Sequence, residues 1–299
     1  MAEPAGLEFK AYEIEELADV YVFRPLGMIA ARMARALRMT PNGVTLTAAA
    51  IGVAGGAMLV SYRLALAGFG LLMLHSVLDS ADGQLARMTR QVSEWGRMLD
   101  GAAGYVTHIS IYLAILFGDA ARAAGPAFLL WAVFAAIANV VHAQLYDYHR
   151  NAYKRAAIDG VTTSRPSTSL RPPASGPGAG HAARGVSSAI VGAYDSMERW
   201  LAGAHPDVEA TIAARAAGGA VRPEDRARYR ECFYWVVRSW NVFGDLPRFY
   251  AIGVLAWFHH LDWFFAFILV PMNGVLALVW LWQWQTDRRF LAGRLETRL

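Results

Sequence analysis

Hydrophobic and polar positions divide the chain into long apolar runs separated by short polar stretches. Each run is close to the roughly 20 apolar residues that cross a bilayer as a helix. Six runs predict six transmembrane helices, at approximately residues 44–61, 64–85, 98–117, 125–146, 245–258 and 261–284. Because Pro247 lies in the first turns of the fifth run, a start near Tyr234 with a break at Pro247 stays open.

A different pattern precedes the first run. Apolar residues recur at helical spacing there, while basic residues fall on another face. The apolar positions are Leu26, Ile29, Met33 and Leu37, and the basic ones are Arg32, Arg35 and Arg38. This pattern predicts an amphipathic helix lying in the membrane interface, with a soluble helix packed on the loops as the alternative. Residues 40–42, Thr-Pro-Asn, then end that helix and turn the chain into the membrane.

These runs define four regions. We expect an interfacial amino-terminal segment (1–40), transmembrane helices 1–4 (41–148), a cytoplasmic insert (149–232), and helices 5–6 with a cytoplasmic tail (233–299). Within the insert, residues 162–180 are rich in Ser, Pro and Gly and predict a flexible linker. Residues 186–202 have helical periodicity, which indicates a small cap or a second interfacial helix.

Composition agrees with an all-α, polytopic membrane protein. Apolar residues make up 56% of the 299 and charged residues 17%, and the mean hydropathy is +0.28. Cys232 is the only cysteine, so a disulfide-stapled secreted domain is excluded. The net charge of +4 comes from basic residues beside the apolar runs. We therefore expect contacts with anionic membrane lipids or phosphates, and no nucleic acid.

The distribution of arginines predicts the orientation. Three connections are rich in arginine, whereas the opposite connections carry only Arg63 and Arg122. The arginines in the rich connections are Arg32, Arg35, Arg38, Arg87, Arg90, Arg97, Arg288, Arg289 and Arg294. By the positive-inside rule, both termini and the connection between helices 2 and 3 face the cytoplasm.

A spaced set of acidic and small residues surrounds that connection. In order they are Asp79, Asp82, Gly83, Ala86, Arg87, Gly96 and Asp100. Asp79 and Asp82 share one helix face, and the small residues continue that face as a groove for a ligand. Two packed helix ends would then surround one cavity with three carboxylates, which suits Mg²⁺ or Mn²⁺ bridging to phosphates. The alternative is that the acids pair with Arg87, Arg90 and Arg97.

This motif resembles the signature of the CDP-alcohol phosphotransferase family (CDP-alcohol phosphatidyltransferases), membrane enzymes of phospholipid biosynthesis. The resemblance implies transfer of a substituted phosphate from a CDP-linked lipid or alcohol, with CDP-diacylglycerol as the expected donor, to an alcohol acceptor, with release of CMP. It implies that Asp79, Asp82 and Asp100 hold one or two divalent metals, Mg²⁺ or Mn²⁺. The substrate-binding residues that it implies are Gly83, Ala86, Arg87 and Gly96, with Asn42 and Thr45 as nucleotide contacts. A homodimer is a further expectation.

Gly104 departs from the family pattern, in which a fourth Asp stands four residues after the third. That Asp is expected to bind metal and to accept the proton of the attacking hydroxyl, which typically accelerates a reaction about 10²–10⁴-fold. His108 lies one turn further on the same face and is the candidate substitute base, with a packing role bonded to a carbonyl as its alternative. Gly101 and Gly104 could instead serve close helix packing.

Several readings of the function therefore stay open. The chain is an active enzyme whose base comes from elsewhere, an impaired relative that binds CDP-lipid without turnover, or an inactivated variant of an ordinary enzyme. A transporter is the alternative from another class, because acids in membrane helices also mark ion paths. Asp245 and Arg248 are expected to form an ion pair or to face the acceptor pocket, and His75 is expected to pack or to line a cavity.

Overall fold

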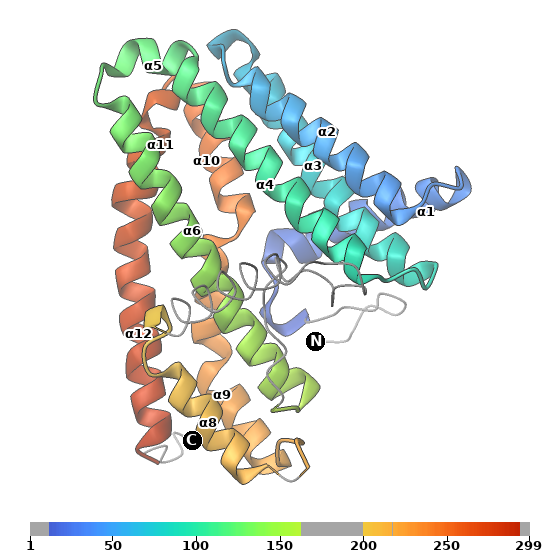
Figure 1. Cartoon of the computed structure of the whole chain (residues 1–299), viewed down its shortest axis with the longest axis vertical. Helices are drawn as coiled ribbons and strands as arrows, with labels where there is room; N and C mark the ends of the chain where they lie inside the picture. The colour runs from blue at the N-terminus through green and yellow to red at the C-terminus, as the bar shows by residue number, and fades with distance from the viewer. Residues whose placement is uncertain (1–11, 163–199, 217, 294–299) are drawn as a thin grey trace, which may run out of the picture.

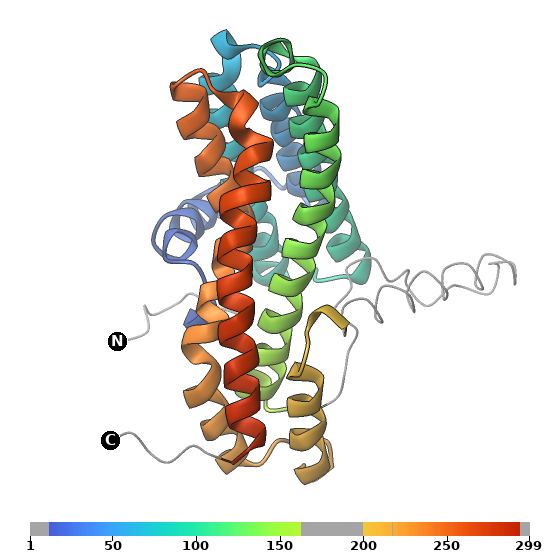
Figure 2. The ribbon, with the colours of Figure 1, turned by 90° about the vertical axis from the view of Figure 1, so that its left-hand side faces the viewer.

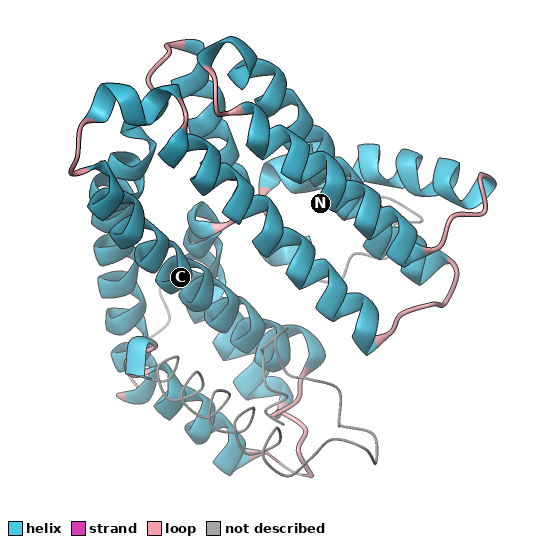
Figure 3. Cartoon of the chain, turned by 45° about the horizontal axis from the view of Figure 1, so that its top comes forward, coloured by secondary structure: helices cyan, strands magenta, loops and turns pink. Residues whose placement is uncertain are grey.

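The computed structural model describes residues 12–162, 200–216 and 218–293. Apart from one isolated bridge between Val161 and Ala220, the regular structure of these residues is helical, as expected for an all-α protein (Figure 3). The helices are η1 (Tyr12–Ile14), η2 (Asp19–Phe23), α1 (Arg24–Ala36), α2 (Pro41–Met58), α3 (Tyr62–Met88), α4 (Glu94–Phe117), α5 (Asp119–Ala124), α6 (Phe128–Tyr153), η3 (Lys154–Asp159), α8 (His205–Arg215), α9 (Pro223–Ser239), η4 (Trp240–Phe243), α10 (Asp245–Trp257), η5 (Leu261–Trp263), α11 (Phe264–Phe267), η6 (Ile268–Met272) and α12 (Asn273–Leu291).

Within the described residues, four helical stretches are long and apolar enough to cross a bilayer. They are Tyr62–Met88, Glu94–Arg122, Phe128–Asp159 and Leu261–Leu291. They contain four of the six predicted runs. The other two runs correspond to α2, of 18 residues, and α10, of 13 residues, and a crossing by these two stays a prediction.

The outer faces of the long helices are apolar. Leu130, Phe134 and Ile137 on α6 are 60%, 57% and 56% exposed, and Leu278 on α12 is 69% exposed. A soluble protein rarely leaves such continuous apolar faces in contact with water. These faces therefore fit contact with lipid, and the chain is an integral membrane protein.

Helix α2 packs closely against α3 and against α4 (Figure 1). Their approach depends on glycine. A Cβ added to Gly55 on α2 would lie 2.9 Å from the carbonyl oxygen of Gly68 on α3, and one added to Gly68 would lie 2.6 Å from the carbonyl oxygen of Gly55. Small residues allow helix backbones to come this close in membranes. The three helices consequently form a tight layer that presents the acidic motif at one end.

The start of α2 follows the predicted turn. Thr40 caps the helix, because its Oγ1 accepts a hydrogen bond from the amide of Gly43 at 3.1 Å, and Pro41 occupies the first helical position. Ser93 caps α4 in the same way, accepting from the amide of Gly96 at 3.0 Å. Both caps place helix starts beside the acidic end of α3.

Helix α1 lies across the ends of the long helices. Figure 2 shows it nearly end-on, whereas α6 and α12 follow the long axis. Ala31 and Ala34 are buried against α2 and α3, while Ile29, Met33 and Leu37 are 55%, 61% and 71% exposed. The predicted apolar stripe therefore does point away from the protein. Its position in the membrane interface stays a proposal.

Helix α10 packs against α3. Its first residue bears on the alternative, left open by the sequence, of a helix that starts near Tyr234 and breaks at Pro247. A Cβ on Gly253 would lie 2.8 Å from the ring of Phe69. The helix begins at Asp245, after α9 has ended at Ser239, so the break lies before Asp245 and not at Pro247; a membrane span that starts near Tyr234 stays a prediction. Pro247 does not break α10, because proline fits the first turn of a helix, where its missing N–H has no acceptor.

The far end of the molecule is a second helical cluster made by α8, α9 and the ends of α6 and α12 (Figure 1). His205 lies at its centre, with Nδ1 2.8 Å from Asp287 Oδ1 and Nε2 2.9 Å from the hydroxyl of Tyr229. The described part of the predicted insert is thus packed and helical. The predicted linker (162–180) and the predicted helix (186–202) fall almost entirely outside the described residues.

Candidate metal and nucleotide site

The three predicted carboxylates lie together. Asp79 and Asp82 come from the end of α3 and Asp100 from the second turn of α4, and one oxygen of each lies within 4.8 Å of the others. Asp82 is buried, whereas Asp79 and Asp100 are exposed. The spacing of these residues in the sequence therefore predicted a real cluster.

Thr45 on α2 fixes the buried member of this cluster. Its hydroxyl donates a hydrogen bond to Asp82 Oδ2 at 2.5 Å, and it also lies 3.1 Å from the carbonyl oxygen of Pro41. Thr45 is 4% exposed. Because its hydroxyl is committed to Asp82, Thr45 orients a carboxylate. Its expected contact with a nucleotide stays a prediction.

The predicted small residues border the cluster. Gly83 and Ala86 lie on α3, and a Cβ on Gly83 would meet Arg87 Nη1 at 3.5 Å. A Cβ on Gly96 would lie 3.3 Å from Asn42 Oδ1. The starts of α2 and α4 therefore meet beside the acidic end of α3, where Asn42, Arg87 and the two glycines surround the carboxylates.

The donor set fits a hard divalent cation. Three carboxylates whose oxygens converge within 4.8 Å repel one another unless a positive charge compensates them. Oxygen ligands at this separation suit Mg²⁺ or Mn²⁺, which keep part of their water shell and bind phosphates as well. The alternative was that the three acids pair with Arg87, Arg90 and Arg97. Arg97 pairs with Glu94 instead, at 3.6 Å.

Gly104 stands beside open space. A Cβ added to it would meet no atom of the described residues within 4 Å. Close packing against another described helix therefore does not explain Gly104, and a packing role of Gly101 stays a prediction. A side chain at this position would be tolerated sterically, so the absence of the fourth carboxylate has no packing reason.

His108 makes the contact with a carbonyl group that was expected for its packing role, and His75 makes a similar contact that was not predicted. His108 Nδ1 lies 3.0 Å from the carbonyl oxygen of Gly104, and the ring stacks on Phe249 of α10 with centroids 5.8 Å apart. His75 Nδ1 lies 2.9 Å from the carbonyl oxygen of Ala48. These contacts support a packing role for His75, but they use only one nitrogen of His108.

The sequence did not predict the neighbour of His108 Nε2. Asp245 Oδ1 lies 3.4 Å from this nitrogen, although the two residues are far apart in the chain and on different helices. Asp245 also lies 3.7 Å from Arg248 Nη1, which agrees with the ion pair expected from their spacing. No signal in the sequence links α4 to α10, because this contact depends on how the two helices pack.

A carboxylate of the amino-terminal segment lies near the start of α10. A Cβ on Gly244 would collide with Glu16 Oε1. Burial, together with the negative charge of Asp19, raises the pKa of Glu16 to about 7 from its usual 4.5. The start of α10 is therefore in an acidic environment.

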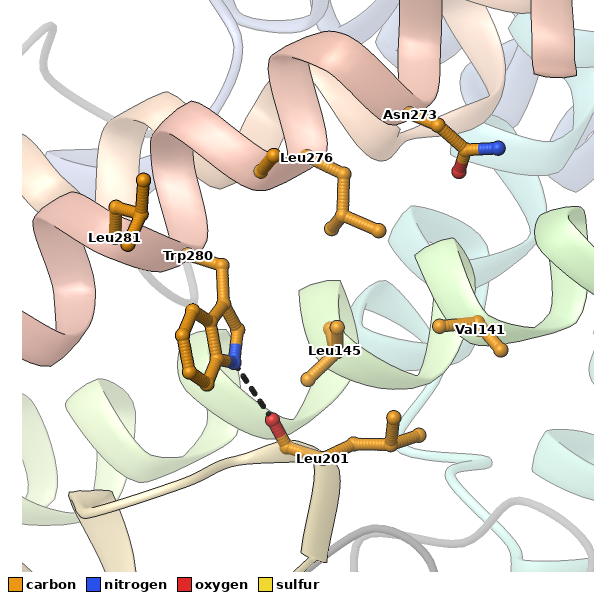
Figure 4. A pocket seen from close by; sticks show the side chains of 8 residues that line it. Val141, Leu145, Leu201, Asn273, Leu276, Trp280 and Leu281 are labelled. Carbon is orange, nitrogen blue, oxygen red and sulfur yellow. Dashed lines mark hydrogen bonds between the residues drawn. The ribbon is translucent and has the colours of Figure 1, made fainter. Parts of the chain in front are cut away.

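The structure also has an apolar pocket of about 380 Å³ elsewhere, between α6, α12 and Leu201 (Figure 4). Trp280 closes one side and donates its indole N–H to the carbonyl oxygen of Leu201 at 2.9 Å. The lining residues carry no charge, and none of them belongs to the acidic motif. This pocket has no part in the chemistry of the carboxylates.

The family model described as CDP-alcohol phosphatidyltransferase matches residues 38–163. No curated protein and no solved structure matches the chain. The matched segment includes α2, α3, α4 and α6 with all three carboxylates, and α8 to α12 lie beyond it.

Proposed function

Because the family model of the CDP-alcohol phosphatidyltransferases matches residues 38–163, we propose that the chain acts as a member of this family: it transfers a substituted phosphate from CDP-diacylglycerol to an alcohol and releases CMP. The family acts in phospholipid synthesis and takes a CDP-linked donor and an alcohol acceptor. The observation that carries the proposal is the convergence of Asp79, Asp82 and Asp100.

In this proposal the three carboxylates hold one or two divalent metal ions. When bound, the metal neutralises charge on the donor's diphosphate and so favours departure of CMP. Thr45 holds Asp82 in place through its 2.5 Å hydrogen bond. Gly83, Ala86 and Gly96 leave room for the nucleotide, Asn42 lies at its border, and Arg87 stabilises a phosphate.

The orientation belongs to the same proposal. Arginines gather around the α3–α4 connection (Arg87, Arg90, Arg97) and in the last turn of α12 (Arg288, Arg289), which by the positive-inside rule directs the acidic cluster toward the cytoplasm. CDP-linked donors and released CMP are charged and would exchange with that side. The exposed apolar stripe of α1 would then lie in the cytoplasmic interface.

Gly104 supports a second candidate. A family member without the fourth carboxylate could bind CDP-lipid and turn it over slowly or not at all, acting as a binding partner or sensor. Open space beside Gly104 means that an Asp could stand there. Turnover separates the two candidates, because both predict metal-dependent binding of CDP.

The test uses the purified full chain in detergent or vesicles with Mg²⁺ or Mn²⁺. CMP release is measured from CDP-diacylglycerol with a panel of alcohols, and a second arm supplies CDP-linked soluble alcohols with diacylglycerol. We expect release with CDP-diacylglycerol, its loss in EDTA and its loss in Asp100→Asn. Asp207→Asn, an exposed acid in the first turn of α8, is the control and should keep the parent rate.

The outcomes separate the candidates. Metal-dependent binding of CDP without CMP release in either arm supports the impaired binder. Release of CMP in the second arm alone would mean that the donor is a CDP-linked soluble alcohol and that diacylglycerol is the acceptor. No metal-dependent CDP binding, measured by calorimetry, contradicts both candidates.

A further inference from the structure

One face of α4 carries Asp100, Gly104 and His108 at intervals of four residues. Asp100 belongs to the carboxylate cluster, and Gly104 contributes no side chain. In the part of the chain that the structure describes, no atom lies within 4 Å of the position that a Cβ of residue 104 would take. The next side chain along this face that can accept a proton is therefore His108.

The hydrogen bond to Gly104 fixes the tautomer of His108. A carbonyl oxygen only accepts, so Nδ1, 3.0 Å from it, must carry a proton. In the neutral ring Nε2 then holds a lone pair. This atom is buried, and within the described structure it has no hydrogen-bond partner.

The lone pair of Nε2 faces a carboxylate. Asp245 Oδ1 lies 3.4 Å from Nε2, just inside the range of an ion pair and too long for a short hydrogen bond. Two acceptors in this arrangement repel each other weakly. One added proton converts the contact into a charge-assisted hydrogen bond, so the pair is arranged to take up a proton.

The surroundings hold Asp245 in position and leave it accessible. It is the first residue of α10, where the helix dipole favours a carboxylate. Arg248 lies 3.7 Å from it and is itself fixed, because Nη1 donates to the carbonyl oxygens of Phe243 and Gly244 at 2.7 and 2.6 Å. The side chain of Asp245 is nevertheless 61% exposed, so a hydroxyl group can reach it.

Most charged groups around the pair are acidic. Arg248 lies on the same helix as Asp245. The titratable groups that act on Asp245 from other elements are His75 and Asp79 on α3, Tyr105 on α4, Tyr146 and Asp147 on α6, and Glu16 in the amino-terminal segment. Asp100 acts on the same Asp79 and His75.

We propose that Asp245 and His108 together accept the proton of the attacking alcohol, in place of the carboxylate missing at Gly104. The inference rests on the proposed function and deepens it. The O–H bond of the alcohol breaks, and its oxygen forms a bond to the phosphorus of the donor. The bond from that phosphorus to CMP breaks, and CMP takes the electron pair. The proton is held between Asp245 Oδ1 and His108 Nε2 and then leaves to water.

The experiment compares the purified full chain with variants by CMP release from CDP-diacylglycerol, using the best alcohol of the panel. Asp245→Asn keeps the shape of the side chain but loses its basicity. His108→Asn keeps an amide donor for the carbonyl of Gly104 and removes Nε2. We expect each to lower kcat about 10²-fold or more while KM for the donor stays unchanged. Asp207→Asn is the matched control and should leave kcat unchanged.

A rescue variant separates proton transfer from a structural role. Gly104→Asp introduces a carboxylate into the open space on α4 and should restore turnover to Asp245→Asn. A purely structural loss would not be restored in this way. The acidic limb of the pH profile of kcat should also move in Asp245→Asn/Gly104→Asp, because the group that accepts the proton has changed.

Each outcome is decisive. Parent-like kcat in Asp245→Asn or His108→Asn overturns the pair and leaves the proposed function intact. A loss that Gly104→Asp fails to restore, in a variant with the parent's thermal unfolding midpoint, also overturns it. If the parent releases no CMP, the proposal that Asp245 and His108 accept the proton is contradicted as well. In that case Mg²⁺-dependent binding of CDP decides separately whether the proposed function survives as the binder.

Discussion

At the scale of single residues, Thr45 shows how a neighbouring helix prepares the carboxylate cluster. Its hydroxyl reaches from α2 to Asp82 on α3, and both side chains are buried. Outer groups that orient metal ligands typically change metal affinity about 10–100-fold when they are removed. Thr45 should therefore affect metal binding although it is not a ligand.

Thr45→Val is expected to weaken binding of Mn²⁺ by about 10-fold or more, because valine keeps the shape and removes the donor. Titration of Mn²⁺ by electron paramagnetic resonance measures this directly. Thr47→Val is the matched control, since Thr47 also bonds a carbonyl of α2 but is exposed. Equal Mn²⁺ affinity in the parent and in Thr45→Val would contradict the role of the hydroxyl.

Residue spacing predicted the cluster but not the partner of His108. Asp79 and Asp82 share a helix face by periodicity alone, and a short loop returns the chain to bring Asp100 beside them. The contact of His108 with Asp245 arises from the packing of α4 against α10 around Phe249. No local pattern encodes such a contact, so only the tertiary structure reveals it.

At the scale of elements, the packing of α2, α3 and α4 depends on where glycine is placed. Gly68 and Gly70 lie two residues apart on α3, and only Gly68 meets a neighbouring backbone. Gly68→Ala should reduce stability by about 1–3 kcal/mol, because the added methyl group forces α2 away. Gly70→Ala should be neutral or stabilising, since alanine favours the helix.

Thermal unfolding in detergent, followed by circular dichroism, measures both variants. The midpoint of Gly68→Ala should fall and that of Gly70→Ala should stay or rise. If both changes shift the midpoint equally, close contact between α2 and α3 at Gly68 is not a source of stability.

Helix boundaries were predicted well where the apolar run and the helix end together. The third run was expected to end at residue 117, and α4 ends at Phe117. By contrast, the fourth run was expected to end at residue 146, whereas α6 continues to Tyr153. Hydropathy marks the segment that suits lipid, and it cannot mark the end of a helix that extends beyond the membrane into the second helical cluster.

At the scale of the whole molecule, the amino-terminal segment connects distant helices. Glu13 pairs with Arg230 at 2.8 Å, and Glu15 forms an ion pair with Arg24. Asn241 donates to the carbonyl oxygen of Ile14 at 3.1 Å. Glu16 then lies against Gly244, between these contacts and α10. The segment thus joins α9 to the start of α10.

Glu16 predicts a pH dependence of stability. Its pKa is raised to about 7 when the protein is folded, from about 4.5 when it is unfolded. The folded state therefore binds more protons, and stability falls as the pH rises from about 4.5 to 7, by at most about 3 kcal/mol. Below that range the contribution is fully present, and above it the loss is complete.

Glu16→Gln should remove this part of the pH dependence. Compared with the variant, the parent's unfolding midpoint in detergent should fall between pH 4.5 and 7 and then keep a constant offset. Glu94→Gln, at an exposed acid of α4, is the control and should follow the parent. Parallel curves for the parent and Glu16→Gln would contradict the burial of this carboxylate.

The shortness of α10 has a consequence for how the protein is made. Its 13 residues extend about 20 Å, less than the roughly 30 Å of hydrocarbon in a bilayer. It also begins with Asp245 and a buried Arg248. Such a segment is poorly suited to enter lipid by itself as it leaves the ribosome. With the six spans predicted from the sequence, it should enter paired with the next helix, after the first four predicted spans have been inserted, so the nascent protein would acquire its carboxylate cluster well before it acquires Asp245.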